Sequence, residues 1–276
     1  MSGRRSRTRA KLAQNLFADE RSAATLVRIA RIAPGERVYD LGAGAGAVTA
    51  ALLAAGARVV AVERDPNLAR KLRARFDGRA EIVEGDLRTT PLAAPFKVVA
   101  NAPFNATADL MRRLLEAAPT PASATLVLQR EAARRYAGQG RPTAQALEAQ
   151  PWFAFDVALP FTRHDFTPAP AVEVAVLKIA QKCVPDLCDD DRDAWRAFVR
   201  HGLARPQDDA RRALRGFVSN LQWRRLAADL GLPTDVLRAE LAYEDWLSIF
   251  RFVRRHAPPR RLARIRSGRP AALASG

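Results

Sequence analysis

Hydrophobic residues alternate along most of the chain between short β-rich runs and longer stretches with helical spacing. The short runs predict five strands, at 37–41, 58–63, 80–84, 97–101 and 124–128. Between them, helical periodicity predicts helices over 47–55, 67–76 and 108–118. A further helix is expected over 23–32, because Pro34 and Gly35 end its pattern. Strands that alternate with crossover helices indicate a parallel, doubly wound sheet.

The pattern changes twice in the rest of the chain. Two more strands, over 153–159 and 172–179, are expected to close the sheet as an antiparallel pair, which makes seven strands in an α/β fold. Beyond Pro185, amphipathic helical stretches cover 195–203, 208–218, 221–230, 234–241 and 243–253. We therefore expect four segments, a basic arm at 1–11, an α/β domain at 12–185, a small all-α domain at 186–250 and a tail at 251–276.

The positive charge is concentrated in the two arms. Of a formal net charge of +16, residues 1–11 contribute five basic and no acidic side chains, and residues 251–276 contribute eight basic and no acidic ones. Segments this rich in arginine, proline and alanine are expected to be disordered and to suit a polyanion such as a nucleic acid. Solubilising tails without a partner are the alternative.

Composition argues against several other classes of protein. The longest uncharged run, 41–57, holds four glycines in seventeen residues, short of the roughly 20 apolar residues of a membrane helix. The basic start leads into Asp19 and Glu20 rather than an apolar segment, which argues against a secretory signal. Cys183 and Cys188 have no neighbouring histidine, so we interpret them as reduced, small apolar side chains. We expect a cytoplasmic protein with no metal site.

The strongest local motif follows the first strand. In Asp40-Leu-Gly42-Ala-Gly44-Ala-Gly46, alternate glycines allow a sharp turn whose backbone N–H groups approach a ligand at a helix N-terminus. This favours a nucleotide-like cofactor. The same residues also fit a dinucleotide-binding fingerprint, and a purely structural glycine turn is a third interpretation.

Acidic residues follow the next two strands. Glu63, at the end of the second strand, is placed to accept both hydroxyls of a ribose, and Asp86, after the third, to accept an adenine amine. Asp65 is a rival for the ribose but is better explained as a helix cap before Pro66. Because ligands of open α/β sheets lie beyond the carboxyl ends of the strands, this recurrence favours a nucleoside pocket over unrelated surface charges or caps.

Asn101-Ala102-Pro103-Phe104 follows the fourth strand and indicates the reaction class. The Asn101 amide oxygen and the Ala102 carbonyl can accept two hydrogen bonds from one planar amino group, while Pro103 stiffens the turn and the Phe104 ring offers a surface for stacking. Two such acceptors favour the more pyramidal nitrogen of a transfer transition state, so no strong base is required. A structural Asn-Ala-Pro turn with a core phenylalanine is the alternative.

The ordered set of motifs resembles a known family. Together with Gln14-Asn15-Leu-Phe17 and Phe166-Thr-Pro-Ala-Pro-Ala-Val, it is similar to the class I S-adenosylmethionine-dependent methyltransferases that modify adenine N6 in ribosomal RNA. The resemblance covers roughly residues 12–250. It implies a Rossmann-like, mostly parallel seven-stranded sheet, a helical RNA-binding domain and no metal.

The resemblance also implies roles for individual residues. The cofactor S-adenosylmethionine would be held by Gln14, Asn15, Phe17, Gly42, Gly44, Gly46, Glu63, Asp86 and Asn101. The target adenine would be contacted by Asn101, Ala102, Pro103, Phe104 and Phe166. In this arrangement Phe104 and Phe166 clamp the flipped base between two rings. The family often has serine where Glu173 or Val174 falls, which leaves the hydrogen bonding of that loop open.

Two branches of the family remain to be distinguished. The short helical domain and the arginine-rich tail resemble the erythromycin-resistance (Erm) enzymes, which methylate 23S rRNA and so block macrolide, lincosamide and streptogramin B binding. The housekeeping 16S rRNA dimethyltransferases are the alternative. A non-enzymatic nucleic-acid-binding protein and a DNA or protein-glutamine methyltransferase are also considered. We expect a monomer that acts on 23S rRNA before or during ribosome assembly.

Overall fold

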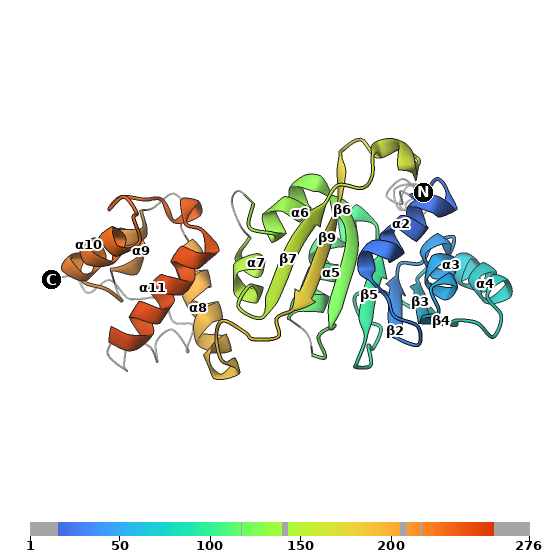
Figure 1. Cartoon of the computed structure of the whole chain (residues 1–276), viewed down its shortest axis with the longest axis horizontal. Coiled ribbons are helices and arrows are strands. Elements are labelled where there is room, and N and C mark those ends of the chain that lie inside the picture. Colours follow the sequence, from blue (N-terminus) through green and yellow to red (C-terminus); the bar gives the residue numbers. More distant parts are fainter. Residues whose placement is uncertain (1–15, 117, 140–142, 205–208, 216, 257–276) are drawn as a thin grey trace, which may run out of the picture. The chain divides into compact units, whose positions relative to one another are not determined.

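The computed structural model describes residues 16–116, 118–139, 143–204, 209–215 and 217–256 (Figure 1). It divides into two compact units. The first holds the described residues up to 137 together with 153–183, and the second holds 138–152 and those from 184 onward. The expected arm at 1–11 and the tail beyond His256 lie outside the described residues.

The first unit is built around the expected seven-stranded sheet, in the order β4-β3-β2-β5-β6-β9-β7. The strands are β2 (Arg37–Leu41), β3 (Arg58–Glu63), β4 (Glu81–Glu84), β5 (Lys97–Ala100), β6 (Ser123–Gln129), β7 (Phe153–Ala158) and β9 (Val174–Gln181). The first five are parallel, and β9 runs antiparallel to both β6 and β7. The predicted α/β fold is therefore confirmed.

Helices lie beside the strands of this sheet (Figure 1). They are α2 (Glu20–Ala30), α3 (Ala47–Ala54), α4 (Pro66–Arg75), α5 (Thr107–Leu115) and α6 (Arg130–Tyr136). Asp19 caps α2 by accepting from the Ser22 N–H at 2.8 Å, and α2 ends where Arg31 adopts a φ of 50°. One apolar cluster joins Leu26 and Leu52 of α2 and α3 to sheet residues such as Val99. This core fixes α3, and with it the glycine turn that precedes the helix.

A small second sheet was not predicted from the sequence. The strand β1 (Leu16–Phe17) pairs antiparallel with β8 (Phe166–Thr167), and Phe17 is the register partner of Phe166. The 3₁₀ turn η2 (Arg163–Asp165) precedes β8, and the Asp165 carbonyl accepts from the Ala18 N–H at 2.8 Å. The pairing therefore joins two motifs that lie about 150 residues apart in the sequence.

The second unit is helical, with a core of aromatic side chains. Its helices are α7 (Ala144–Ala149), α8 (Arg192–Leu203), α9 (Ala210–Leu214), α10 (Asn220–Asp229) and α11 (Tyr243–His256), with 3₁₀ turns η3 (Asp189–Asp191) and η4 (Arg238–Glu240). The fully buried Trp195 and Phe250 rings meet edge to face with their centroids 5.2 Å apart. The Trp195 indole N–H donates to the Leu147 carbonyl at 2.9 Å, which ties α8 to α7.

Several expectations need correction. The segment 138–152, expected within the α/β domain, packs with the helical unit. The helix α11 continues to His256, so residues 251–256 are not part of a disordered tail. The stretch 234–241 forms only the short turn η4. The two cysteines, Cys183 and Cys188, are exposed free thiols. No helix among the described residues is long and apolar enough to span a membrane.

Candidate active site

The glycine turn connects the carboxyl end of β2 to α3. Gly42, Gly44 and Gly46 have φ values of 85°, 55° and 84°, in the left-handed region that only glycine adopts at little cost. The N–H groups of Gly42 and Ala43 donate to the Val62 carbonyl of the neighbouring strand, at 2.8 and 3.0 Å. A Cβ added at Gly44 would lie 2.9 Å from the Leu16 side chain, so β1 crosses this turn closely.

Glu63 supports the same turn from the end of β3. Its side chain is buried; Oε2 accepts from the Gly44 N–H and Oε1 from the Asp65 N–H, both at 2.8 Å. Asp65 caps α4 by accepting from the N–H groups of Asn67 and Leu68 at 2.8 and 3.4 Å, as predicted. The two acids therefore have separate roles, and Glu63 is the one that lies against the glycine turn.

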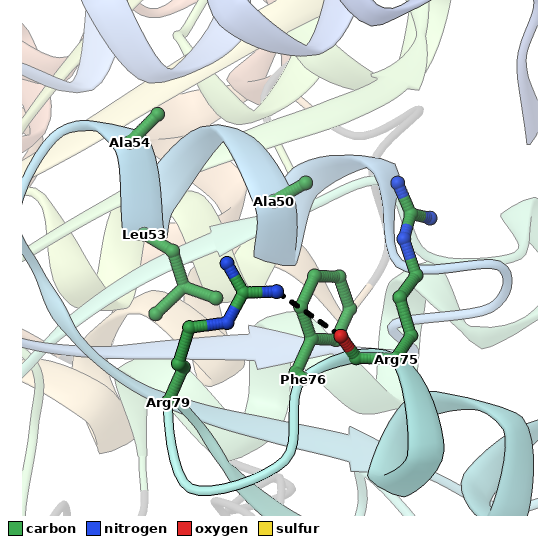
Figure 2. Close-up of a pocket in the computed structure, with 6 residues that line it drawn as sticks. All are labelled: Ala50, Leu53, Ala54, Arg75, Phe76 and Arg79. Atoms are coloured by element: carbon green, nitrogen blue, oxygen red, sulfur yellow. Dashed lines mark hydrogen bonds between the residues drawn. The ribbon is translucent and has the colours of Figure 1, made fainter.

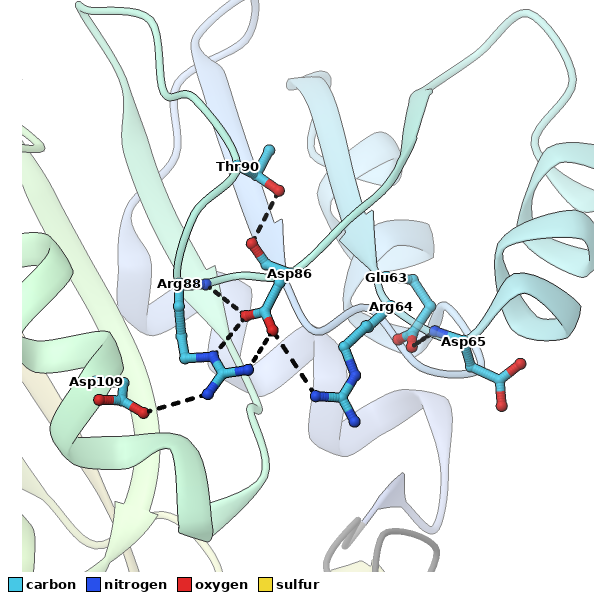
Figure 3. A network of polar contacts seen from close by, with 7 residues as sticks. All are labelled: Glu63, Arg64, Asp65, Asp86, Arg88, Thr90 and Asp109. Carbon is cyan, nitrogen blue, oxygen red and sulfur yellow. Dashed lines mark hydrogen bonds and ion pairs between the residues drawn. The ribbon is translucent and has the colours of Figure 1, made fainter. Parts of the chain in front are cut away.

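Asp86 follows β4 and lies between two arginines (Figure 3). The Arg88 guanidinium donates to it from both Nε and Nη2, with Nε 2.8 Å from Oδ1, and Arg64 Nη1 lies 3.7 Å from Oδ2. Hydrogen bonds from Arg88 lower the pKa of Asp86 to about 2. Asp86 is therefore an ionised acceptor, but Arg88 occupies part of its hydrogen-bonding capacity. No motif in the sequence indicates this partner.

The turn after β5 lies directly beside the glycine turn. A Cβ added at Gly42 would lie 3.6 Å from Pro103 Cδ, 3.7 Å from Ala102 Cα and 3.7 Å from Leu87 Cδ2. The structure therefore brings the Asn101–Phe104 turn and the glycine turn together at one edge of the sheet, as the sequence predicts for parallel strands. Leu87, which no motif indicated, also belongs to this contact.

Asn101 is half-buried immediately after β5, and Ala102 is buried. Pro103 has an extended backbone, and its carbonyl accepts from the Ala106 N–H at 2.9 Å at the start of the 3₁₀ turn η1 (Phe104–Ala106). This turn leads directly into α5. Phe104 is half-buried and packs against the apolar cluster that contains Leu26 and Leu52.

The aromatic residues of the site form a cluster. The Phe17 and Phe166 rings stack with centroids 5.1 Å apart, and Phe161 meets Phe166 edge to face at 5.9 Å. Phe166 is only 2% exposed. It therefore presents no open face here, contrary to the expected clamp, and stacking of a base on Phe166 requires the Phe17–Phe166 pair to separate. Gln14 and Asn15 lie outside the described residues.

The structure defines the hydrogen bonding of the loop after β8, which the sequence leaves open. Glu173 forms an ion pair with Arg130, and its carbonyl accepts from the Arg130 N–H at 2.9 Å. Val174 is buried as the first residue of β9, opposite Gln129. The hydrogen bonds that hold this loop therefore connect it to the start of α6 rather than to a serine.

One buried acid was named only as part of the glycine motif. Asp40 is 1% exposed at the end of β2, and its Oδ2 accepts from the Thr49 hydroxyl at 2.6 Å. Burial, reinforced by the nearby charge of Glu63, raises the pKa of Asp40 to about 7, although Thr49 opposes the shift. The bond between Asp40 and Thr49 ties β2 to the first turn of α3 and so braces the glycine turn.

The residues around the glycine turn fit an adenosyl cofactor. The turn has positive-φ glycines, a buried carboxylate at the end of the adjacent strand and a cradle at Gly42 that a Cβ would fill. No group of three acidic, histidine or cysteine side chains suited to a metal ion occurs among the residues that the structure describes.

Comparison with known proteins agrees with a methyltransferase site. The profile of the family described as ribosomal RNA adenine dimethylase matches residues 5–255. The chain is 31% identical to the mycinamicin-resistance protein MyrB of Micromonospora griseorubida, over 94% of this chain and 85% of that protein. It is 30% identical to the ribosomal RNA small subunit methyltransferase A of Thermosynechococcus vestitus, over 90% of this chain and 97% of that protein.

A solved structure supports the fold. The crystal structure of the 23S rRNA methyltransferase ErmE superimposes with a TM-score of 0.79 and 26% identity, and the match covers 87% of this chain and all of that one. With the sheet and the glycine turn described above, this makes the chain a class I S-adenosylmethionine-dependent methyltransferase. It belongs to the ribosomal RNA adenine dimethylase family, and its substrate is ribosomal RNA. The enzyme class and cofactor expected from the sequence are confirmed.

Proposed function

We propose that this enzyme methylates adenine N6 in the peptidyl-transferase loop of 23S rRNA and thereby confers resistance to macrolides, lincosamides and streptogramin B. The observation that carries the proposal is the similarity to MyrB, which is described as a resistance protein, over 94% of the chain. The match to the whole ErmE chain, a 23S rRNA methyltransferase, supports it. The first unit is the catalytic part, and the helical second unit binds RNA.

When bound, the cofactor would supply a methyl group activated by its sulfonium centre, and breaking the C–S bond would leave a neutral thioether. Glu63 would accept hydrogen bonds from the ribose, and Asp86 would accept one from the adenine amine. The backbone of Gly42, Gly44 and Gly46 allows the cofactor to approach the chain closely. Gln14 would also contact the cofactor, and Asn15 and Phe17 would line its methionine end.

The target amine is held by the turn after β5. The Asn101 amide oxygen and the Ala102 carbonyl accept its two hydrogens and favour a pyramidal nitrogen, whose lone pair is then available to the methyl group. Pro103 limits the freedom of this turn, and Phe104 provides the stacking surface for the flipped base. Phe166 completes the clamp once it separates from Phe17. The proton lost from nitrogen passes to solvent, because no strong base is needed.

A second candidate is methylation of 16S rRNA. It is favoured by the match to a small subunit methyltransferase over 97% of that protein. The Asn101–Phe104 turn fits both activities, since each modifies adenine N6.

Transfer of a labelled methyl group to purified, protein-free 23S and 16S rRNA tests the proposal. We expect label on 23S rRNA alone. Label confined to 16S rRNA would support the second candidate, and no label on either would argue against both. Expression in a macrolide-sensitive host should raise the inhibitory concentrations of all three drug classes together. Sedimentation of the purified enzyme checks the expectation that it is a monomer.

A further inference from the structure

Basic side chains gather on α4 and the turn that follows it. Residues 70–79 contain five basic side chains and one acidic side chain, Asp77. All five basic residues are exposed: Arg70, Lys71, Arg73, Arg75 and Arg79. Most of the excess positive charge lies in the terminal arms, so the distribution of charge along the sequence does not predict this surface. Such a stripe attracts polyanions by releasing their counterions.

The basic stretch ends at a pocket, which we call the α3–α4 pocket. Its volume is about 550 Å³, and it is lined by Ala50, Leu53, Ala54, Arg75, Phe76 and Arg79 (Figure 2). Side chains of α3 and the Phe76 ring form its apolar part. Figure 2 shows the Phe76 ring between the two arginine side chains. The pocket therefore combines two guanidinium groups with an apolar wall.

The charge of these arginines is poorly compensated. Arg79 Nη2 donates to the Arg75 carbonyl at 3.0 Å, and its guanidinium carbon lies 5.7 Å from the Phe76 ring centroid. Within the described part of the chain, no carboxylate lies in ion-pair range of Arg79. Arg75 has one acidic neighbour, Glu20, at 3.7 Å, and the Glu20 side chain is 89% exposed. Exposed pairs of this kind contribute little.

We propose that the α3–α4 pocket binds a backbone phosphate of the ribosomal RNA substrate, as a contact separate from the target-adenine site. A guanidinium can donate two parallel hydrogen bonds to a phosphate, and the apolar wall fits the face of the adjoining sugar. The proposal rests on the chain being an rRNA methyltransferase and holds for either rRNA. Of the two pocket arginines, Arg79 is the proposed phosphate ligand, because its hydrogen bond and its ring contact are with Arg75 and Phe76, both within the pocket.

Two other residues of the pocket, Arg75 and Phe76, also support the glycine turn. Arg75 Nη1 donates to the Ala45 carbonyl at 2.9 Å, and a Cβ added at Gly46 would lie 2.7 Å from Phe76 Cε2. Substitution of Arg75 or Phe76 would therefore disturb the glycine turn as well as the pocket. Arg79 has no contact of this kind, which makes it the residue to change.

The test compares Arg79→Ala with Arg37→Ala, using an rRNA transcript that the wild type methylates. Arg37 is exposed at the amino end of β2, so its variant removes the same charge away from the pocket. We expect Arg79→Ala to weaken RNA binding roughly threefold to tenfold and to reduce the salt dependence of log K by about one. The control should keep the wild-type slope, and cofactor affinity should match the wild type in both variants.

An unchanged salt slope in Arg79→Ala would overturn the proposal. A photo-crosslinking amino acid at Ala54, exposed at the end of α3, should join the protein to the RNA, and the absence of a crosslink would also contradict it. Titration with AMP tests whether the phosphate bound in the pocket belongs to a free nucleotide rather than to the RNA backbone. AMP binding that is lost in Arg79→Ala, with RNA binding intact, would assign the pocket to nucleotides instead. A wild type that binds and methylates no rRNA would refute the proposed function itself.

Discussion

The buried carboxyl of Asp40 makes the stability of the first unit depend on pH. Its pKa is raised from an ordinary 3.8 to about 7, because burial disfavours the charged form. The groups that face it are Thr49, which donates to it, and Glu63, whose negative charge adds to the shift. Between about pH 4 and about pH 7, Asp40 is therefore a neutral acid in the folded enzyme, while the unfolded chain has already lost the proton.

The sign and size of the effect follow from this difference. The stability that Asp40 contributes is fully present below about pH 4 and is lost as the pH rises to about 7. Three pH units correspond to roughly 4 kcal/mol, of which roughly 3 kcal/mol falls between about pH 5 and about pH 8. Asp40→Asn removes the titration and retains an oxygen that can accept from the Thr49 hydroxyl.

The assay must report on the first unit. All four tryptophans belong to the second unit, so their fluorescence reports on the unfolding of that unit and not of the first. Urea titrations at both pH values should instead be read by a hydrogen-exchange pulse at one fixed pH, in peptides from β2 and β3. The free energy of unfolding of the wild type, minus that of the variant, should fall by roughly 3 kcal/mol between about pH 5 and about pH 8. A difference that does not change with pH would contradict the prediction that buried Asp40 holds a proton in the folded enzyme.

Three further outcomes are expected. Gly46→Ala should destabilise the first unit by roughly 2–4 kcal/mol, because the φ of Gly46 is 84° and the added Cβ would lie 2.6 Å from Leu72 Cδ2. Gly35 has a φ of 80° but open space around it, so Gly35→Ala measures the backbone cost alone. Equal losses of stability in the two variants would contradict the predicted clash. Asn101→Ala should lower kcat at least about 100-fold without weakening cofactor binding, whereas the exposed Asn105→Ala should retain activity; full activity in Asn101→Ala would exclude the assigned role. Deleting 257–276, which contains five arginines, should reduce the salt slope of RNA binding, and an unaltered slope would argue against a phosphate-binding tail.

The sheet could be predicted because its strands carry strong local signals. The β-rich runs at 37–41 and 58–63 coincide with β2 and β3. Glycine and proline mark the boundaries of the first helix and of the glycine turn. By contrast, β1 and β8 contain two residues each, and only their pairing across the chain defines them. The stretch 234–241 is amphipathic, yet it forms a single 3₁₀ turn, since periodicity over so few residues does not ensure a helix.

The candidate site could be predicted at the level of its turns but not of its contacts. Parallel strands bring the ends of β2, β3 and β5 to one edge, so Glu63 and the Asn101 turn were expected beside the glycines. Nothing in the local pattern indicates that Arg88 pairs with Asp86 or that Phe166 is buried against Phe17. Those contacts depend on side-chain packing between segments that are distant or irregular in the sequence.

The modified nucleotide itself gives the most direct test. Ribosomal RNA from cells that express the enzyme, and from matched cells that express Asn101→Ala, can be mapped by primer extension and mass spectrometry. The account predicts N6-methylated adenine in the peptidyl-transferase loop of 23S rRNA with the wild type only. Methylated adenine confined to 16S rRNA, or an identical modification with Asn101→Ala, would contradict it.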